Sequence, residues 1–149
     1  MTVQEIFKLH PQPTTLDREV LLRCICECID CAASCIACAD ACLSEKDLQN
    51  LVRCIRLNLD CADVCDATGG ILARQTLPDL RLIRATVEAC AVACLACAEE
   101  CELHAAHHEH CRLCAEVCRR CKQACDDVLA TLGQGSHAPP SSLSTATLR

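Results

Sequence analysis

Large aromatic side chains are almost missing from this sequence. Its 149 residues include one phenylalanine and neither tryptophan nor tyrosine. The core of an ordinary domain depends on large aliphatic and aromatic side chains. The apolar half of this chain is instead mostly alanine, leucine, valine, isoleucine and cysteine. The cysteines must therefore fill core volume in addition to any chemical role.

Long apolar runs and an excess of positive charge are also missing. No run of 18 apolar residues lacks a charge, so no membrane span is predicted. The first residues, MTVQEIFKLHPQP, show no basic segment followed by an apolar one, and no secretory signal is predicted. The net charge is −6 with acids and bases interleaved, which argues against a nucleic-acid partner. We expect a cytoplasmic protein without a membrane partner.

What the sequence has in abundance is cysteine, 19 in all. A fraction this high usually signals a disulfide scaffold in a short secreted chain. In the cytosol thiols stay reduced, and a dense cysteine pattern there indicates metal binding or catalysis. Structural disulfides are therefore not expected.

Four long helices are predicted. The first covers residues 16–43, which contain no glycine or proline, and Thr14 or Thr15 is its expected N-cap. The second starts at a capping-box pattern at 44–47 and runs to about 74, with Gly69 and Gly70 expected to weaken or kink its end. The third starts at 76–79 with Pro78 in its first turn and ends near 104. After a His-rich link at 105–108, the fourth ends near 132, with Gly133 as its stop.

Helices of this length with short links predict an all-α fold, an antiparallel up-down-up-down four-helix bundle. We expect three parts along the chain. Residues 1–13 form a short N-terminal helical segment, residues 14–132 form the bundle, and residues 133–149 form a disordered tail rich in Ser, Thr, Pro and Ala.

The cysteines follow the helix repeat. Within each predicted helix they are spaced three and four residues apart, or fall in a frame with that spacing, which is the stripe that faces the centre of a bundle. Cys26 is the exception and lies on the far side of its helix. The 18 cysteines of this seam are Cys24, Cys28, Cys31, Cys35, Cys38, Cys42, Cys54, Cys61, Cys65, Cys90, Cys94, Cys97, Cys101, Cys111, Cys114, Cys118, Cys121 and Cys125.

Buried cysteine can be no more than a small apolar side chain. Replacing leucine by cysteine throughout a core, however, removes apolar contacts worth roughly 1 kcal/mol or more per site. A seam of 18 thiols would leave the empty core underpacked unless something fills it. The seam cysteines are therefore predicted metal ligands.

The identity of the metal follows from softness, geometry and charge. Thiolates select Cu(I), zinc and iron–sulfur clusters, and the last two need discrete groups of four ligands. Cu(I) accepts two or three sulfurs and tolerates bridging thiolates, which suits an unbroken row. About one Cu(I) per thiolate, roughly 18 ions, would leave the core neutral, whereas four Zn²⁺ would leave a charge of about −10. A zinc or general thiol-metal sink of metallothionein type is the alternative, and an iron–sulfur protein a weaker one.

The two ends of the predicted bundle differ. Apolar seam residues plug one end: Leu16, Val20 or Leu21, Leu72, Leu80, Ile83, Val87, Val128 and Leu132. At the other end the cysteines run nearly to the loops, and His104 and His107 continue their stripe, with His108 and His110 nearby. Imidazole is a competent Cu(I) ligand and more labile than a bridging thiolate. We expect metal to enter and leave at the His end, with His104 as the leading ligand there. Asn58 is a polar seam residue that either contacts metal or sets the register of the helices.

The repeat Cys24-xxx-Cys28-xx-Cys31-xxx-Cys35-xx-Cys38-xxx-Cys42 resembles that of the bacterial copper storage proteins, over about residues 14–132. The resemblance implies a four-helix bundle filled with thiolate-bound Cu(I), assembly into a homotetramer, and a cytosolic storage protein rather than an enzyme. By this resemblance the ligands are the seam cysteines and His104, and a copper chaperone or chelator is a possible partner.

Overall fold

The computed structural model describes residues 1–12 and 14–134 and contains five helices over them, with no strand. They are α1 (Thr2–Lys8), α2 (Arg18–Leu43), α3 (Leu48–Ala73), α4 (Leu80–His104) and α5 (Glu109–Gln134). The all-α prediction and the number of long helices are confirmed. None of the helices in this described part is long and apolar enough to cross a bilayer.

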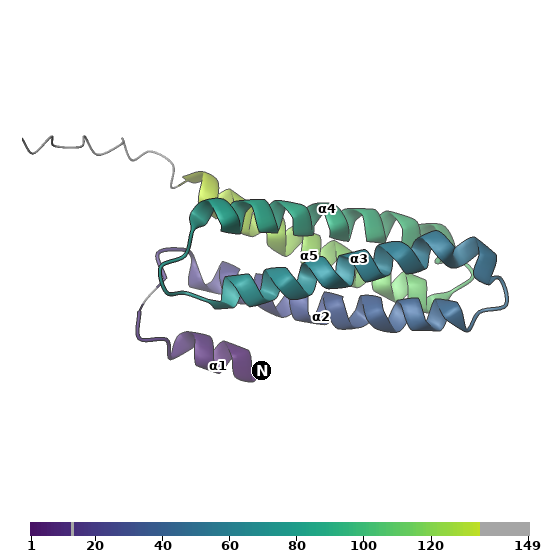
Figure 1. The fold of residues 1–149 in the computed structure, drawn as a ribbon, viewed down its shortest axis with the longest axis horizontal. Coiled ribbons are helices and arrows are strands. Elements are labelled where there is room, and N and C mark those ends of the chain that lie inside the picture. Colours follow the sequence, from purple (N-terminus) through teal and green to yellow (C-terminus); the bar gives the residue numbers. More distant parts are fainter. Residues whose placement is uncertain (13, 135–149) are drawn as a thin grey trace, which may run out of the picture.

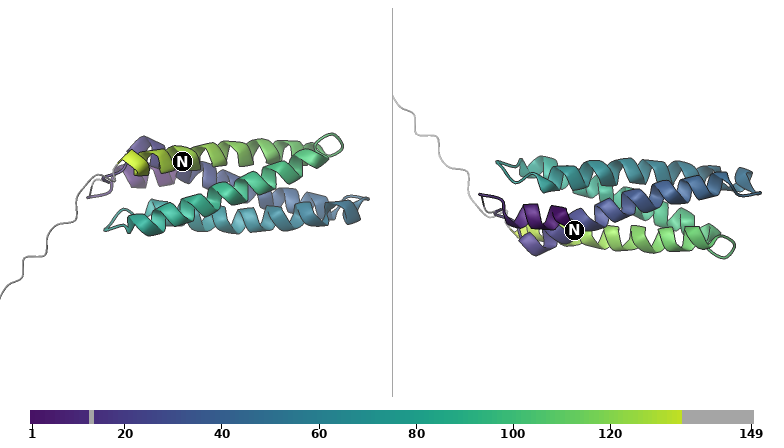
Figure 2. Two further views of the ribbon diagram at one scale, coloured as in Figure 1. Left: turned by 90° about the horizontal axis from the view of Figure 1, so that it is seen from above. Right: turned by 90° about the horizontal axis from the view of Figure 1, so that it is seen from below.

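The four long helices form an elongated antiparallel bundle, and the short α1 lies against its side at one end (Figure 1). In the ring of helices, α2 packs against α3, α3 against α4, α4 against α5, and α5 against α2. The loops at 44–47 and 105–108 lie together at one end, and the α3–α4 loop lies at the other (Figures 1 and 2). This is the predicted up-down-up-down topology.

The helix starts differ in detail from the prediction. Asp17, and not Thr14 or Thr15, caps α2, because its carboxylate accepts the backbone N–H of Glu19 and Val20 at 3.0 and 3.1 Å. Asp79 caps α4 in the same way, so Pro78 precedes the helix instead of lying in its first turn. A carboxylate satisfies free N–H groups and also favours the positive end of the helix dipole.

The predicted capping box at 44–47 does not form. Asp47 is the N-cap of α3, but its side chain makes no capping hydrogen bond. Its carboxylate instead accepts a hydrogen bond from His108 Nε2 at 3.3 Å. A contact between two loops therefore replaces the local capping contact.

The prediction that Gly133 stops the last helix is wrong, since Gly133 lies inside α5, which ends at Gln134. Gly69 and Gly70 lie within α3, which continues to Ala73. A Cβ atom at Gly69 would lie 3.4 Å from the Cβ of Cys28, so glycine lets α3 approach α2 closely. The predicted disordered tail falls mainly on residues 135–149, which lie outside the described residues.

Small side chains hold the helices close together beside the cysteine seam. The alanines that flank the seam on all four helices are buried, namely Ala32, Ala39, Ala62, Ala91, Ala98, Ala115 and Ala124. Close backbones keep the interior narrow, so that thiols from all four helices meet at its centre.

The predicted apolar plug is present, with one exception. Leu72, Ile83, Val87, Val128 and Leu132 are buried, and of the two alternatives Leu21 is buried while Val20 is half-buried. The prediction that Leu80 belongs to the plug is wrong, because Leu80 is 46% exposed in the first turn of α4. Phe7 of α1 adds its ring to this cluster at 3% exposure. The predicted short N-terminal helix therefore packs on the bundle.

Candidate metal centre

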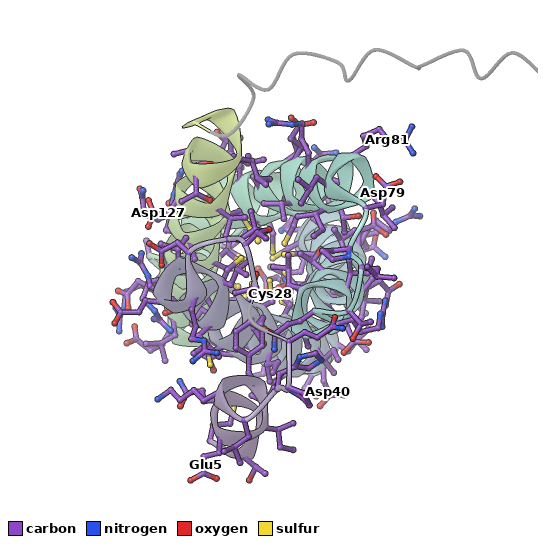
Figure 3. The ribbon with its side chains drawn as sticks, turned by 90° about the vertical axis from the view of Figure 1, so that its left-hand side faces the viewer. Glu5, Cys28, Asp40, Asp79, Arg81 and Asp127 are labelled. Atoms are coloured by element: carbon purple, nitrogen blue, oxygen red, sulfur yellow. The ribbon has the colours of Figure 1, made fainter. Side chains whose placement is uncertain are left out.

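All 18 seam cysteines lie inside the bundle. Sixteen are 0% exposed, and Cys38 and Cys114 are 3% exposed. The view along the bundle axis shows sulfur atoms gathered between the four helices, with Cys28 among them, while Asp40, Asp79 and Asp127 lie on the outside (Figure 3). Cys26 is half-buried and accepts a hydrogen bond from Gln4 Nε2 at 3.2 Å, so it faces α1 and not the seam.

The sulfur atoms form a continuous network between helices. Neighbouring Sγ atoms lie 3.5 Å apart for Cys65 and Cys94, 3.6 Å for Cys54 and Cys101, and 4.0 Å for Cys38 and Cys111. All 19 thiols are free in the structure, and these separations are far above a disulfide bond length of about 2.05 Å. A soft metal about 2.3 Å from each of two sulfurs can join atoms at such separations without backbone movement.

Potential four-ligand sites overlap along the core. One group contains Cys31, Cys35, Cys61 and Cys118, and the next contains Cys35, Cys97, Cys114 and Cys118. Two further groups share Cys121: Cys28, Cys90, Cys121 and Cys125, and Cys31, Cys65, Cys94 and Cys121. Within each group the ligand atoms lie within 4.8 Å of one another. Because neighbouring groups share ligands, this row suits bridging thiolates better than separate cages.

Asn58 is the one amide among these thiols in the described core, and it is fully buried. Its Nδ2 donates to the Cys54 carbonyl at 2.9 Å and lies 3.4 Å from the Cys54 sulfur. Its Oδ1 accepts from the thiols of Cys114 at 3.0 Å and Cys97 at 3.4 Å. The amide therefore joins three helices through the thiol network, and its oxygen lies among sulfur atoms.

The thiol pKa values are set by burial and by hydrogen bonds among the thiols. Burial raises the pKa of Cys42 to about 11 and also raises that of Cys111. Hydrogen bonds from Cys125 and Cys28 lower the pKa of Cys24 to about 5. No Lys or Arg is among the buried residues of the described chain, so thiolate charge has no buried side-chain cation beside it. Any thiolate charge in this core is therefore compensated only if a cation binds, and otherwise the thiols stay protonated.

The four histidines at 104–110 have different surroundings. His104 is half-buried, with Nε2 3.2 Å from a carboxylate oxygen of Glu100, and His107 is exposed. His108 is 8% exposed and lies between two carboxylates, with Nδ1 3.2 Å from Glu45 and Nε2 3.3 Å from Asp47. His108 therefore ties the two loops at this end of the bundle together.

His110 faces the thiols. Its Nδ1 lies 3.4 Å from the sulfur of Cys38 and 3.5 Å from that of Cys111, and Nε2 lies 3.0 Å from Glu45. Because a carboxylate accepts, Nε2 donates to Glu45, and in the neutral ring this tautomer leaves the Nδ1 lone pair directed at the sulfur atoms. His110, Cys38, Cys42 and Cys111 form a further four-ligand group. Extending the cysteine stripe along each helix favoured His104 over His110 as a metal ligand. The position of His110, four residues before Cys114, was a signal in the sequence for a ligand at His110.

Comparison with known proteins decides the identity of the family. The family model described as copper storage protein matches residues 17–130. The chain belongs to the copper storage protein family. The copper storage protein Ccsp of Streptomyces lividans, solved with 10 copper equivalents, is 51% identical, with a TM-score of 0.85 over 87% of this chain and 98% of that one.

Other relatives agree with this family. A structure of the cytosolic copper storage protein of Streptomyces lividans with five coppers is 55% identical, with a TM-score of 0.74 over 75% of this chain and 93% of that one. An uncharacterized cysteine-rich protein of Bacillus subtilis, YhjQ, is 38% identical over 72% of this chain and 94% of its own length. The predicted copper storage function is confirmed at the level of the family: the chain belongs to a copper storage family, its relative was solved with 10 copper equivalents, and its own buried cysteines form groups that could hold metal. The family implies a storage role rather than catalysis.

Proposed function

We propose that the 18 seam cysteines are the copper ligands and hold about one Cu(I) per thiolate, roughly 18 ions in a full core. The observation that carries this assignment is the overlap of the four-thiol groups, in which Cys31, Cys35, Cys118 and Cys121 each belong to two. Shared ligands allow one continuous cluster to fill the interior. Cys26, which faces α1, is outside the cluster. The protein acts as a store or buffer and not as an enzyme.

Charge favours Cu(I) over zinc as the stored ion. A core with no buried Lys or Arg in the described residues stays neutral only if the metal charge equals the thiolate charge. One monovalent ion per thiolate meets this condition. A few divalent ions in separate tetrahedral sites leave most thiolate charge uncompensated.

Anaerobic titration of the fully reduced protein with Cu(I), against a competing chromophoric chelator, tests this proposal. We expect binding to continue to roughly one equivalent per seam thiol. Saturation after only a few equivalents would contradict the storage assignment. Tight binding of four or five zinc ions with tetrahedral thiolate spectra would favour the zinc sink. Cys26→Ser is the matched control and should leave the capacity unchanged.

We further propose that metal exchanges at the end of the bundle marked by the histidines, with His104 and His110 as ligands there. The contacts of His110 Nδ1 with Cys38 and Cys111 support its part. For His104 the support is its position three residues after Cys101 on the seam. Replacing either by alanine should change the rates of uptake or release more than the capacity. His10→Ala, at the plugged end, is the control, and unchanged rates in both test variants would overturn this role.

The surface also supports self-association into the predicted homotetramer. Ile29, Ile36 and Leu43 are 42%, 55% and 56% exposed and recur every seven residues on α2. Val52 and Leu59, with the same spacing on the neighbouring α3, are 59% and 44% exposed. Apolar stripes of this kind mark interaction surfaces. In sedimentation velocity the wild type should be tetrameric and Ile36→Glu smaller, whereas a monomeric wild type would contradict the proposal.

A cytosolic location and a copper-delivering chaperone or chelator complete the proposal. The proposal is supported by the free thiols, the form that a reducing compartment maintains, and by a structural relative that is named as cytosolic. Fractionation of cells that express the full chain tests the location. Recovery of the protein outside the cytosol with oxidised cysteines would contradict it.

A further inference from the structure

Nitrogen and oxygen atoms form a second cluster of metal-ligating groups at the His end of the bundle, outside the thiol core. Glu45 lies in the α2–α3 loop, His108 in the α4–α5 loop, and His110 in the first turn of α5. One carboxylate oxygen, Glu45 Oε1, lies 3.2 Å from His108 Nδ1 and 3.0 Å from His110 Nε2. Two ring nitrogens therefore converge on the same oxygen. We refer to these three residues as the loop site.

The spacing of the loop site suits a small divalent ion. Zn²⁺ binds ring nitrogens and carboxylate oxygens at about 2.0–2.2 Å, so neighbouring ligand atoms of a tetrahedral site lie about 3.4 Å apart. The two measured contacts are only slightly shorter, and small side-chain rotations supply the difference. The ring centroids of His108 and His110 are 5.5 Å apart and the rings are inclined at 37°, so both rings can flank one ion. The side chains of Glu45 and His110 are 35% and 25% exposed, which leaves the fourth position to water.

A neighbouring carboxylate orients the loop site. The other ring nitrogen of His108, Nε2, lies 3.3 Å from Asp47. Metal-binding histidines almost always donate their second N–H to a carboxylate, carbonyl or water, which fixes the ring. A neutral imidazole has a single N–H and can satisfy only one of two carboxylates. In His108 this N–H goes to Asp47, and a cation between Nδ1 and Glu45 satisfies the second contact.

The donor atoms of the loop site select a different metal from the core. Thiolates prefer Cu(I), whereas a set of imidazole and carboxylate ligands without sulfur suits a divalent ion such as Zn²⁺. The carboxylates of Glu45 and Asp47 also place two negative charges beside the site, which attract a divalent ion more strongly than a monovalent one.

His110 connects the loop site to the thiols. Its Nδ1 lies 3.4 Å from the sulfur of Cys38 and 3.5 Å from that of Cys111. A neutral imidazole offers a lone pair at only one of its nitrogens. When Nε2 donates to Glu45, the lone pair of Nδ1 is available to Cu(I). When Nε2 binds a divalent ion, the proton is on Nδ1, which then donates to sulfur and no longer binds copper.

We propose that the loop site binds one Zn²⁺ ion and that this ion closes the His end of the bundle to Cu(I). The proposal rests on the proposed exchange of Cu(I) at that end with His110 as a ligand, and it adds a means of regulation. The zinc ion joins the two loops through metal–ligand bonds and removes His110 from the copper path. Copper in the core stays on its thiols, while its uptake and release become slower.

Zinc binding at the loop site is a ligand exchange without a change of oxidation state. The ion gives up water ligands and forms bonds to Glu45 Oε1, His108 Nδ1 and His110 Nε2. The proton of His110 moves from Nε2 to Nδ1. Any Cu(I) that was bound to Nδ1 keeps its thiolate ligands, so no oxidant or reductant is needed.

Zinc titration of the fully Cu(I)-loaded chain tests the loop site itself, because copper then occupies the core thiols. The wild type should bind one equivalent of Zn²⁺, and ¹H–¹⁵N spectra of the histidine rings should show metal on His108 Nδ1 and His110 Nε2. Glu45→Gln should weaken this binding roughly tenfold or more. Glu109→Gln, the same change at an exposed carboxylate beside the site, is the matched control. Equal affinity in wild type and Glu45→Gln, or a metal-bound signal at exposed His107 instead of His108, would overturn the site.

Release kinetics test the closure. Transfer of Cu(I) from the loaded wild type to excess bathocuproine disulfonate should be roughly tenfold slower with one equivalent of Zn²⁺, which corresponds to a barrier higher by about 1.4 kcal/mol. In Glu45→Gln the rate should be the same with and without zinc, whereas Glu109→Gln should keep the slowing. The same concentration of Mg²⁺ is the control for ionic strength and should have no effect. An unchanged release rate in the wild type with the loop site occupied would overturn the closure.

The two proposals fail in different ways. Full Cu(I) capacity without a zinc-bound signal at His108 and His110 would overturn the loop site and leave storage intact. A low Cu(I) capacity would overturn the proposed storage stoichiometry instead. The loop site would still be tested in that case, because zinc on core thiols produces no metal-bound signal at His108 Nδ1.

Discussion

At the scale of single residues, the core is unusual because its polar groups satisfy one another. Asn58 illustrates this: its Nδ2 donates to the Cys54 carbonyl, and its Oδ1 accepts from the thiols of Cys114 and Cys97. A buried amide is tolerated because both its donor and its acceptor are paired. Asn58 therefore fixes the relative positions of three helices before any metal is bound.

Replacing Asn58 by alanine should destabilise the metal-free protein. The change removes the amide oxygen that accepts from the thiols of Cys114 and Cys97, and losing the partner of a buried polar group costs about 1–3 kcal/mol. Urea unfolding of the reduced protein measures the effect. Asn50→Ala, at an exposed position of the same helix, is the control. An equal free energy of unfolding for the two variants would show that Asn58 does not hold the core together.

The contacts of His108 make a prediction about pH. Burial alone would lower the pKa of His108, but its hydrogen bonds with Asp47 and Glu45 outweigh burial and raise that pKa above 6.5. The pKa of the Glu45 carboxyl is lowered below 4.5, first by its hydrogen bond with His110 and then by its hydrogen bond with His108. The raised histidine pKa contributes stability below about pH 6.5 that is lost as the pH rises through the folded value. The lowered carboxyl pKa contributes stability above about pH 4.5 that is lost on acidification.

The loop contacts should therefore be strongest between about pH 4.5 and 6.5. In Glu45→Gln the pKa of His108, followed by NMR titration, should fall relative to the wild type. Glu109→Gln, which removes a charge outside this contact, should leave it near the wild-type value. An unchanged His108 pKa in Glu45→Gln would mean that Glu45 does not stabilise the charged imidazole.

At the scale of the elements, glycine has a different role at two neighbouring positions of α3. Gly69 is buried against Cys28, whereas Gly70 is exposed and a Cβ atom there would meet only the flexible end of Arg74 at 3.9 Å. Glycine inside a helix costs about 0.5–1 kcal/mol relative to alanine. Close packing of the helices requires it only at the first position.

Gly70→Ala should therefore stabilise the metal-free protein by about 0.5–1 kcal/mol in chemical unfolding. Gly69→Leu should destabilise it, because the added side chain must push α3 away from α2. If the leucine variant proved as stable as the wild type, the close approach of these helices would not depend on Gly69.

The short helix α1 is held by few contacts. Phe7 is 3% exposed, and its carbonyl accepts a hydrogen bond from Gln75 Nε2 at 3.1 Å. Cutting back a buried phenylalanine to alanine costs about 3–5 kcal/mol in a packed core. A helix of seven residues can detach locally while the bundle stays folded, so the loss of Phe7 contacts need not lower the stability of the whole bundle.

In Phe7→Ala we expect faster hydrogen exchange in residues 2–9, with unchanged exchange in α3 and α5. Ile6→Ala, at a side chain 66% exposed on the same helix, is the control. Faster exchange throughout the bundle would contradict this prediction and make α1 part of the cooperative core.

At the scale of the whole molecule, the core has the side chains of a metal site in the positions that apolar packing occupies in an ordinary bundle. Sulfur atoms stand where larger apolar side chains normally pack, so the empty protein lacks part of the packing energy of an ordinary bundle. Metal that binds the folded protein more tightly than the unfolded chain restores stability by mass action. Storage and folding are therefore coupled in one interior.

Loading with Cu(I) should raise the thermal midpoint of unfolding steeply with the number of ions bound. A site at 1,000 times its dissociation constant contributes about 4 kcal/mol if the unfolded chain does not bind. Calorimetry at increasing Cu(I) equivalents under anaerobic conditions measures the rise, and a strong Cu(I) chelator should reverse it. A midpoint that does not change with loading would mean that the metal binds outside the packed core.

The sequence alone determined the helices and the interior. A three-and-four spacing maintained through 18 cysteines has one geometric meaning, because only a helix places such residues on one face. The ranges of α2 to α5 follow to within a few residues, and the burial of all 18 seam cysteines follows from the same periodicity. The helix starts were less predictable, because a threonine and an aspartate a few residues apart are both acceptable caps.

The tertiary structure decided what depends on contacts between distant segments. The preference for His104 over His110 came from extending a stripe along one helix. The contacts of His110 with Cys38 and Glu45 instead depend on how α5 and the 44–47 loop approach each other. The contact of Asp47 with His108 in place of its own helix and the exposure of Leu80 arise in the same way. Periodicity fixes the direction of a side chain around its own helix, but the surroundings it meets there are set by the packing of the other helices.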